Sequence, residues 1–168
     1  MSSAFRLYLL RHARASWAQP GQTDFERTLD DVGYADAEIM ANTATDQGFR
    51  PDLVLCSTAA RCRQTIEPFQ RAAGQGLEIR FLDTLYTGDM ETYRALIAAN
   101  GDVGSLMLVG HNPSIQDVFH SLTSRTTSEN AAPHGFLPGM LAVIDFTAFS
   151  QVTTGPPGIL TALLSAPA

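Results

Sequence analysis

The sequence predicts an α/β domain: a three-layer sandwich with a mostly parallel central sheet, helices on both faces and antiparallel edge strands. Two observations support this fold class. Short continuous apolar runs recur along the chain, as is typical of strands buried in a parallel sheet. Segments with helical spacing of apolar residues lie between these runs. With 168 residues, 45% of them hydrophobic, the chain can bury one sizeable core, and we expect residues 1–168 to form a single domain.

Strands and helices are expected to alternate over most of the chain. The predicted strands are 5–10, 53–56, 77–82, 105–109, 140–146 and 158–164, the last two being the antiparallel edges. The predicted helices are 30–47, ended by Gly48, then a helix capped by Ser57 or Thr58 that runs to Gln70, then 89–99 with Asp89 as its N-cap, and 114–122. A hairpin-like turn is expected at 153–157. The polar, Gly/Pro-rich stretch 123–139 predicts a long loop that could act as a lid.

Composition excludes several classes of protein. A net charge of −6 and a pI near 5.0 are unlike a nucleic-acid binder, which carries a basic face. No apolar run approaches the ~18 residues that a membrane span needs, and the first residues do not resemble a signal peptide. We therefore expect a cytoplasmic protein with no membrane or nucleic-acid partner, either a monomer or a weak dimer. Cys56 and Cys62 are expected to be small buried residues.

Three polar motifs follow predicted parallel strands. Arg11 and His12 end the first strand, Ser57 and Arg61 follow the second, and the Gly-His-Asn-Pro run at 110–113 follows a later one. Ligands of open α/β sheets bind at the carboxyl ends of the strands, so these residues are expected to share one pocket. Arginine grips phosphate with two parallel N–H groups, and imidazole can donate a proton or attack. The motifs therefore predict a site for a tetrahedral anion.

One familiar phosphatase motif is excluded. Cys56 and Arg61 are reminiscent of the loop of cysteine phosphatases, but four residues separate them here instead of five. All 11 basic residues are arginine, which we attribute mainly to compositional bias, except where position argues for a role. A metal-dependent hydrolase is disfavoured because no His/Asp ligand set has suitable spacing.

The run Leu10-Arg11-His12-Ala13 resembles the Arg-His-Gly signature of the histidine phosphatase superfamily. The similarity is greatest to its small phosphohistidine phosphatase (SixA-like) branch and spans roughly residues 5–146. The other matching residues are Arg14, Ser16 and Trp17, then Asp24, Arg27, Leu29 and Gly33, then Ser57, Arg61 and Thr65, and finally the run at 110–113.

This resemblance implies a metal-free and cofactor-free ping-pong mechanism. His12 would attack phosphorus and carry a covalent phosphohistidine, which water then hydrolyses. Arg11, Arg61 and His111 would hold the phosphoryl oxygens, consistent with the charge that phosphoryl transfer spreads over them. Arg14, Ser16 and Asn112 are further candidates for phosphate binding.

The sequence departs from the larger phosphoglycerate-mutase-like members at their proton-donating glutamate, where Thr87 stands. Asp24, Asp83 and Asp89 are nearby candidates for a general acid, and none is at the matching position. A general acid contributes about 10²–10⁴-fold, and an alkoxide needs it far more than imidazole, whose pKa is ~6.5. The substitution favours phosphohistidine on a signalling protein as the substrate.

Two alternatives stay open, a broad phosphatase of small phosphate compounds and a non-catalytic phosphoryl-binding module. Less specific expectations concern single residues. His120 is expected to pack within its helix, and His134 could touch substrate from the loop. Arg27 is expected either to bind substrate or to pair with a neighbouring carboxylate, and Trp17 is expected to anchor its loop.

Overall fold

The computed structural model describes residues 4–166. Its strands are β1 (Phe5–Arg11), β2 (Leu53–Ser57), β3 (Glu78–Leu82), β4 (Ser105–Gly110), β5 (Leu141–Phe146) and β6 (Ile159–Leu164). Its helices are α1 (Asp31–Asp46), α2 (Ala60–Ala73), α3 (Thr84–Thr87), α4 (Met90–Ala98), α5 (Ser114–Thr123), α6 (Arg125–Ala131) and α7 (Gln151–Thr154), with a 3₁₀ turn, η1 (Asp24–Glu26). The predicted fold class is confirmed.

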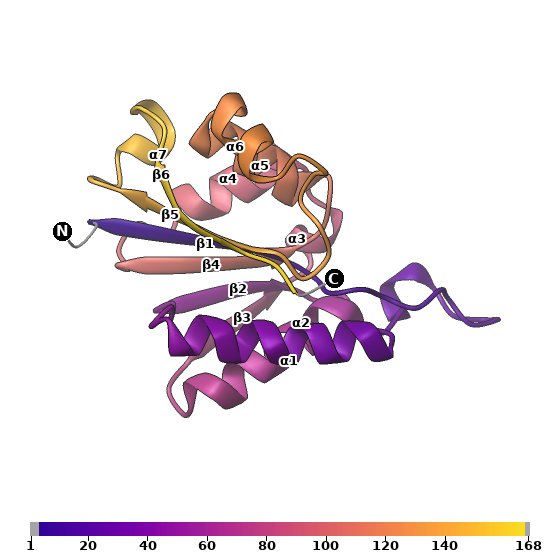
Figure 1. The fold of residues 1–168 in the computed structure, drawn as a ribbon. Helices are drawn as coiled ribbons and strands as arrows, with labels where there is room; N and C mark the ends of the chain where they lie inside the picture. The colour runs from indigo at the N-terminus through magenta and orange to yellow at the C-terminus, as the bar shows by residue number, and fades with distance from the viewer. Residues whose placement is uncertain (1–3, 167–168) are drawn as a thin grey trace.

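The strands form one six-stranded sheet in the order β3-β2-β4-β1-β5-β6 (Figure 1). β1 pairs with β4 in parallel, and β2 pairs in parallel with both β4 and β3. β5 is antiparallel to β1, and β6 is antiparallel to β5. The register places Arg11 opposite Gly110, so the ends of β1 and β4 lie level with each other. The sheet thus brings the predicted motifs to one edge.

The side chains of β1 alternate between two cores, as the two-residue period of a strand requires. Phe5, Leu7 and Leu9 belong to one buried cluster, which includes residues of α4 and α5. Tyr8 and Leu10 belong to the other, which includes residues of α1 and α2. Figure 1 shows these helix pairs on opposite faces of the sheet. Because both faces of β1 are buried, its apolar run is continuous.

Several predicted boundaries need correction. β5 is not an edge strand, because it lies between β1 and β6 and nearly all of it is buried. The segment 123–139 is not wholly a loop, since it contains α6, which Ser124 caps by accepting a hydrogen bond from the Thr127 amide. The turn expected at 153–157 overlaps α7.

α2 is longer and starts later than expected. It ends at Ala73, and its N-cap is Ala59, which makes no side-chain capping bond. Ser57 Oγ instead accepts the Ala59 amide hydrogen at 3.2 Å, just outside the helix. By contrast, the predicted N-cap Asp89 is confirmed, because its carboxylate accepts the Thr92 amide hydrogen. Within residues 4–166 no helix combines the length and apolarity needed to cross a membrane.

Candidate active site

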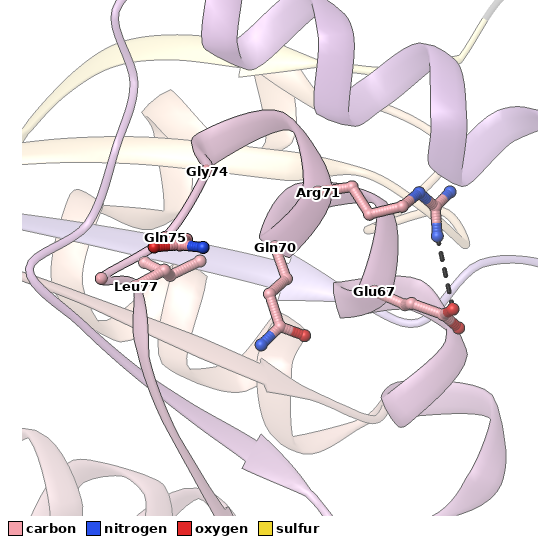
Figure 2. Close-up of a pocket in the computed structure, with 7 residues that line it drawn as sticks. Glu67, Gln70, Arg71, Gly74, Gln75 and Leu77 are labelled. Carbon is pink, nitrogen blue, oxygen red and sulfur yellow. Dashed lines mark ion pairs between the residues drawn. The ribbon is translucent and has the colours of Figure 1, made fainter.

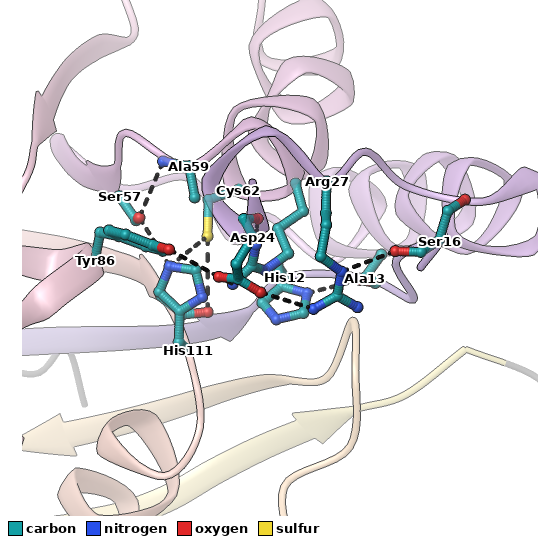
Figure 3. Close-up of polar contacts among 12 residues, drawn as sticks. His12, Ala13, Ser16, Asp24, Arg27, Ser57, Ala59, Cys62, Tyr86 and His111 are labelled. Atoms are coloured by element: carbon teal, nitrogen blue, oxygen red, sulfur yellow. Dashed lines mark hydrogen bonds and ion pairs between the residues drawn. The ribbon is translucent and has the colours of Figure 1, made fainter. Parts of the chain in front are cut away.

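His12 and His111 lie beside each other where β1 and β4 end (Figure 3). The His12 amide donates to the Gly110 carbonyl at 3.1 Å, extending the parallel ladder by one residue. The two imidazole rings have centroids 5.3 Å apart. Two histidines from distant parts of the sequence therefore lie side by side because their strands are neighbours.

His12 has a defined tautomer. Its Nδ1 lies 2.8 Å from the Ala13 carbonyl oxygen, and a carbonyl oxygen only accepts hydrogen bonds. Nδ1 therefore carries the proton, and Nε2 keeps its lone pair. Burial lowers the pKa of His12 to about 3, and nearby His111, Arg61 and Arg11 act in the same direction. The ring is neutral near pH 7, as a nucleophile requires.

The guanidinium groups of Arg61, which is buried, and Arg11, which is partly buried, lie near this ring. Arg61 is 6% exposed, and Arg11 donates from Nη1 to the Phe136 carbonyl at 2.9 Å. The Nε atoms of both arginines are buried without a hydrogen-bond partner among residues 4–166. An unsatisfied buried donor costs about 1–3 kcal/mol, and more when it is charged. An oxyanion bound beside His12 would supply the acceptors that these donors lack.

Ser57 and Cys62 hold the imidazole ring of His111 in place. Its Nε2 lies 2.8 Å from Ser57 Oγ and 3.5 Å from Cys62 Sγ. Ser57 Oγ already accepts the Ala59 amide hydrogen, so its own hydrogen is free to point at Nε2. When this hydroxyl donates to Nε2, Nδ1 of His111 carries the N–H. Burial and then Arg61 lower the pKa of His111 to about 4, so its ring is neutral near pH 7.

The backbone around both histidines is fixed by hydroxyl groups. Tyr93 accepts the His111 amide hydrogen at 3.2 Å and donates to the Leu85 carbonyl at 2.6 Å. A Cβ atom at Gly110 would lie 2.8 Å from Tyr93 Cε2 and closer still to the phenol oxygen, which explains why glycine precedes His111. Thr65 Oγ1 accepts the Ala13 amide hydrogen and donates to the Arg61 carbonyl. The threonine of the second motif thus ties the loop after His12 to α2.

Asp24 is the one candidate acid that contacts the predicted phosphate-binding residues. Its carboxylate accepts from Arg61 Nη2 at 3.0 Å. It also accepts from Arg27 Nη1 at 3.0 Å and from the Tyr86 hydroxyl at 2.8 Å (Figure 3). These donors, Tyr86 first, hold the pKa of Asp24 well below its usual range. Asp24 is therefore a carboxylate at neutral pH, and proton donation from it is disfavoured.

The other two candidate acids are engaged elsewhere. Asp83 is exposed and accepts from Thr58 Oγ1 at 2.5 Å. Asp89 caps α4, and its hydrogen bonds with Thr92 lower the pKa of its carboxyl. Thr87, which is expected at the position of the glutamate of the larger phosphoglycerate-mutase-like members, hydrogen-bonds weakly to the Asp83 carbonyl at 3.4 Å.

Of the three further phosphate-binding candidates, one contacts the same residues as the site and two do not. Asn112 donates to the Phe136 carbonyl, which also binds Arg11, and its Oδ1 is buried without a partner in the described part of the chain. Arg14 is ion-paired with Asp30 at 2.5 Å, and its side chain is 60% exposed. Ser16 contributes its carbonyl to Arg27 Nε at 2.9 Å. Asn112 therefore shares a hydrogen-bond partner with Arg11, whereas Arg14 and Ser16 belong to the neighbouring loop.

The less specific expectations have mixed outcomes. Arg27 pairs with Asp24, which is one of its two predicted roles. His120 packs against Phe119 and hydrogen-bonds to Ser128, as expected of a structural residue. Trp17 does not anchor its loop, because it is 86% exposed and the Arg27 guanidinium lies over its ring. Cys56 and Cys62 are buried, as predicted.

Tyr86 is the main residue that the sequence does not reveal. Besides donating to Asp24, its ring lies edge-on to His111 with centroids 5.5 Å apart, and it packs against Phe25 at 5.0 Å. No motif singles it out, because its partners lie in distant segments. The alignment with larger relatives points to its neighbour Thr87, and so finds the region without finding the residue.

Two surface cavities can be compared with this site. One of about 450 Å³ lies at the far end of α2, beside the ion pair of Glu67 with Arg71, and contains none of the motif residues at the strand ends (Figure 2). Another of about 570 Å³ is lined by Arg14, Trp17 and Arg27. We assign the chemistry to the residues at the strand ends. The second cavity lies in the loop that follows β1, next to these residues.

Residues 7–103, more than half of the chain, match the family model of the histidine phosphatase superfamily (branch 1). The chain belongs to the histidine phosphatase superfamily. This confirms the resemblance found in the motifs and supports the expected enzyme class. The match ends before His111, which the structure adds to the site through β4.

Solved structures of this superfamily agree with the fold. The crystal structure of a candidate phosphohistidine phosphatase, SixA of Agrobacterium tumefaciens, is 44% identical with a TM-score of 0.87, covering 96% of this chain and 97% of that one. Its counterpart from Nakamurella multipartita is 27% identical with a TM-score of 0.79, covering 98% and 97%. This histidine phosphatase therefore resembles both over nearly their whole lengths.

A curated relative is more distant. An uncharacterised chloroplast protein of Arabidopsis thaliana is 30% identical over 128 residues, which make up 70% of this chain and 59% of that protein. The match thus spans less than two thirds of the plant protein. It extends the superfamily relationship without specifying a substrate.

Proposed function

We propose that this histidine phosphatase hydrolyses phosphohistidine through a covalent intermediate on His12. The observation that carries the proposal is the pairing of a neutral His12, with its Nε2 lone pair free, and two buried guanidinium Nε–H donors that lack partners within residues 4–166. The imidazole supplies the nucleophile, and the cations stabilise charge on the phosphoryl oxygens. His111 contributes a second neutral imidazole beside His12, with an N–H at Nδ1 when Ser57 donates to Nε2.

The reaction proceeds by two displacements at phosphorus. In the first, Nε2 of His12 bonds to phosphorus while the bond to the substrate's imidazole nitrogen breaks. The substrate imidazole leaves as a neutral group when its second nitrogen already carries a proton. In the second, water attacks phosphorus, the bond to Nε2 breaks, and orthophosphate and neutral His12 are restored. Arg11 and Arg61 hold the transferring group throughout.

The acid groups around the site favour this leaving group. Asp24 is ionised, Asp89 caps a helix, and Thr87 replaces the glutamate of larger relatives. Without a proton donor, an alkoxide would lose about 10²–10⁴-fold in rate, whereas imidazole leaves with little assistance. The similarity to the Agrobacterium SixA protein supports the same substrate class.

We further propose that the phosphohistidine is carried by a protein, such as a signalling protein. Three large apolar side chains are exposed on the segments that build the site: Trp17 at 86%, Leu137 at 43% and Phe25 at 37%. Phe25 adjoins Asp24, and Leu137 adjoins Phe136, whose carbonyl binds Arg11. Exposed apolar groups next to a catalytic centre are typical of a protein contact surface.

A substrate panel tests the proposal. Phosphohistidine on a folded domain, an aryl phosphate and a sugar phosphate are compared by kcat/KM. We expect the phosphohistidine domain to exceed the sugar phosphate by about 10²-fold or more, the value of the missing general acid. A higher kcat/KM for the sugar phosphate would instead favour a small-molecule phosphatase. Vanadate binding without turnover of any substrate would favour a phosphoryl-binding module.

A further inference from the structure

Arg61 directs both of its terminal nitrogens at one residue. Nη1 donates to the backbone carbonyl of Asp24 at 2.8 Å, and Nη2 donates to Asp24 Oδ2 at 3.0 Å. The third nitrogen, Nε, is buried and has no partner in the described part of the chain. Asp24 thus occupies one edge of the guanidinium and leaves another edge open.

The geometry of a guanidinium makes this division meaningful. The group is planar and carries five N–H bonds in a fixed arrangement. The end edge, between Nη1 and Nη2, faces Asp24. The side edge consists of Nε–H and the second hydrogen of Nη2. Either edge can grip two oxygens of a phosphoryl group in parallel, and only the side edge is available here.

We propose that Asp24 is a positioning residue, which fixes Arg61 so that its side edge grips the phosphoryl group beside His12. The proposal rests on the function proposed above and assigns Asp24 a role different from that of general acid. Two further contacts hold the carboxylate in place: the Tyr86 hydroxyl on Oδ2 at 2.8 Å and Arg27 Nη1 on Oδ1 at 3.0 Å. Tyr86 also packs on His111, so it couples the orientations of both phosphate-binding groups.

The same contacts argue against two other roles for Asp24. A carboxylate that accepts three hydrogen bonds, two of them from guanidinium groups, holds no proton to donate. A carboxylate that blocked phosphate binding would occupy the free side edge of the Arg61 guanidinium. Both contacts from Arg61 to Asp24 instead lie on the end edge of that guanidinium. One of these contacts comes from the backbone of η1, which a shift of the side chain would leave intact.

The test compares Asp24→Ala with Asp24→Asn. The asparagine side chain keeps an oxygen that can accept from Arg61 and Tyr86, so this variant retains the positioning contact without the charge. We expect Asp24→Ala to lower kcat/KM up to about 10²-fold, by the same factor for aryl phosphates with good and poor leaving groups. Asp24→Asn should recover most of this loss. Asp46→Asn, which changes an exposed carboxylate in the last turn of α1, is the matched control.

Other outcomes overturn the proposal in distinct ways. A loss that grows with the pKa of the leaving group, equal in the Ala and Asn variants, identifies a general acid. A gain in activity or in vanadate affinity in both variants shows that Asp24 blocks phosphate binding. An effect of Asp24→Ala that persists undiminished in an Arg61→Ala background shows that Asp24 does not act through Arg61.

Vanadate affinity, measured by calorimetry, separates this proposal from the proposed function. Asp24→Ala is expected to weaken vanadate binding about tenfold, with recovery in Asp24→Asn, whether or not any phosphoryl substrate is turned over. Unchanged vanadate affinity in Asp24→Ala contradicts the positioning role. Failure of the wild-type protein to cleave phosphohistidine contradicts only the function proposed above.

Discussion

The imidazole Nδ1 of His12 donates a hydrogen bond to the Ala13 carbonyl at 2.8 Å, in a site where the histidine is 9% exposed. This contact sets the tautomer, and burial sets the charge. The neighbouring cations Arg11 and Arg61 add to the cost of protonating the ring. The backbone carbonyl of the following residue therefore fixes the ring of His12, the proposed nucleophile, in the tautomer that leaves Nε2 unprotonated.

The first prediction concerns the protonation of His12 and His111. Their pKa values, lowered by burial to about 3 and about 4, keep both rings neutral at neutral pH. Between these values and the unfolded pKa of ~6.5, the unfolded chain binds more protons than the folded one. The free energy of unfolding should consequently fall as the pH falls from ~6.5 toward the folded-state pKa values. Nitrogen NMR follows the protonation of the two rings directly, and urea denaturation at several pH values measures the free energy of unfolding. Titration of His12 near its ordinary pKa would refute the prediction.

The second prediction concerns Arg11. Arg11→Lys keeps the positive charge but removes the planar pair of N–H donors. We expect kcat/KM to fall by about 10²–10³-fold, as for loss of a preorganised donor to a developing oxyanion. Arg125→Lys, at a side chain 78% exposed on α6, serves as the control and should match the wild-type protein. Retention of full activity by Arg11→Lys would show that charge alone is sufficient at this position.

The third prediction concerns the close approach at Gly110. In Gly110→Ala the new Cβ would clash with the Tyr93 hydroxyl, which also binds the His111 amide. We expect a loss of about 1–3 kcal/mol in the free energy of unfolding, together with reduced activity. Tyr93→Phe in the same chain should not restore the stability, because Tyr93 Cε2 would still lie 2.8 Å from the new Cβ and the hydrogen bonds to His111 and Leu85 would be lost. Urea denaturation measures both, and an unchanged midpoint in Gly110→Ala would contradict the packing described.

The positions of the proposed phosphate-binding motifs can be predicted because each follows an apolar run, and parallel strands end at one edge. The register of Arg11 with Gly110 shows this reasoning at the level of single residues. Helix α6 escapes prediction because its Ser, Thr and Asn content is typical of loops. It is stabilised by the Ser124 cap and by buried Ser128, whose hydroxyl hydrogen-bonds to the helix's first turn and to His120.

Tyr86 and Trp17 show where sequence reasoning fails for a different reason. The Tyr86 hydroxyl contacts a carboxylate 62 positions away, a relationship that depends on how α3 and η1 meet. A large aromatic side chain such as Trp17 is usually well buried, yet its loop extends away from the sheet (Figure 1). Both outcomes depend on tertiary arrangement, which no local pattern encodes.

The fourth prediction follows from the exposure of Trp17. Trp17→Ala should raise KM for phosphohistidine on a folded domain by about tenfold or more, as expected for an aromatic contact residue, while kcat/KM for an aryl phosphate stays unchanged. Ile159→Ala, at a residue 67% exposed on edge strand β6, is the matched control. Equal effects of Trp17→Ala on both substrates would show that the tryptophan supports the site itself and not the contact with a protein.

The central claim is that His12 carries the phosphoryl group. Its most direct test is rapid-quench trapping with a phosphohistidine domain labelled with radioactive phosphate, followed by peptide mapping. We predict a transient, acid-labile and alkali-stable phosphoenzyme on His12, absent from His12→Ala and present in His134→Ala, which removes an exposed histidine from the loop after α6. Turnover without any phosphoenzyme, or label recovered on a residue other than His12, would contradict the account.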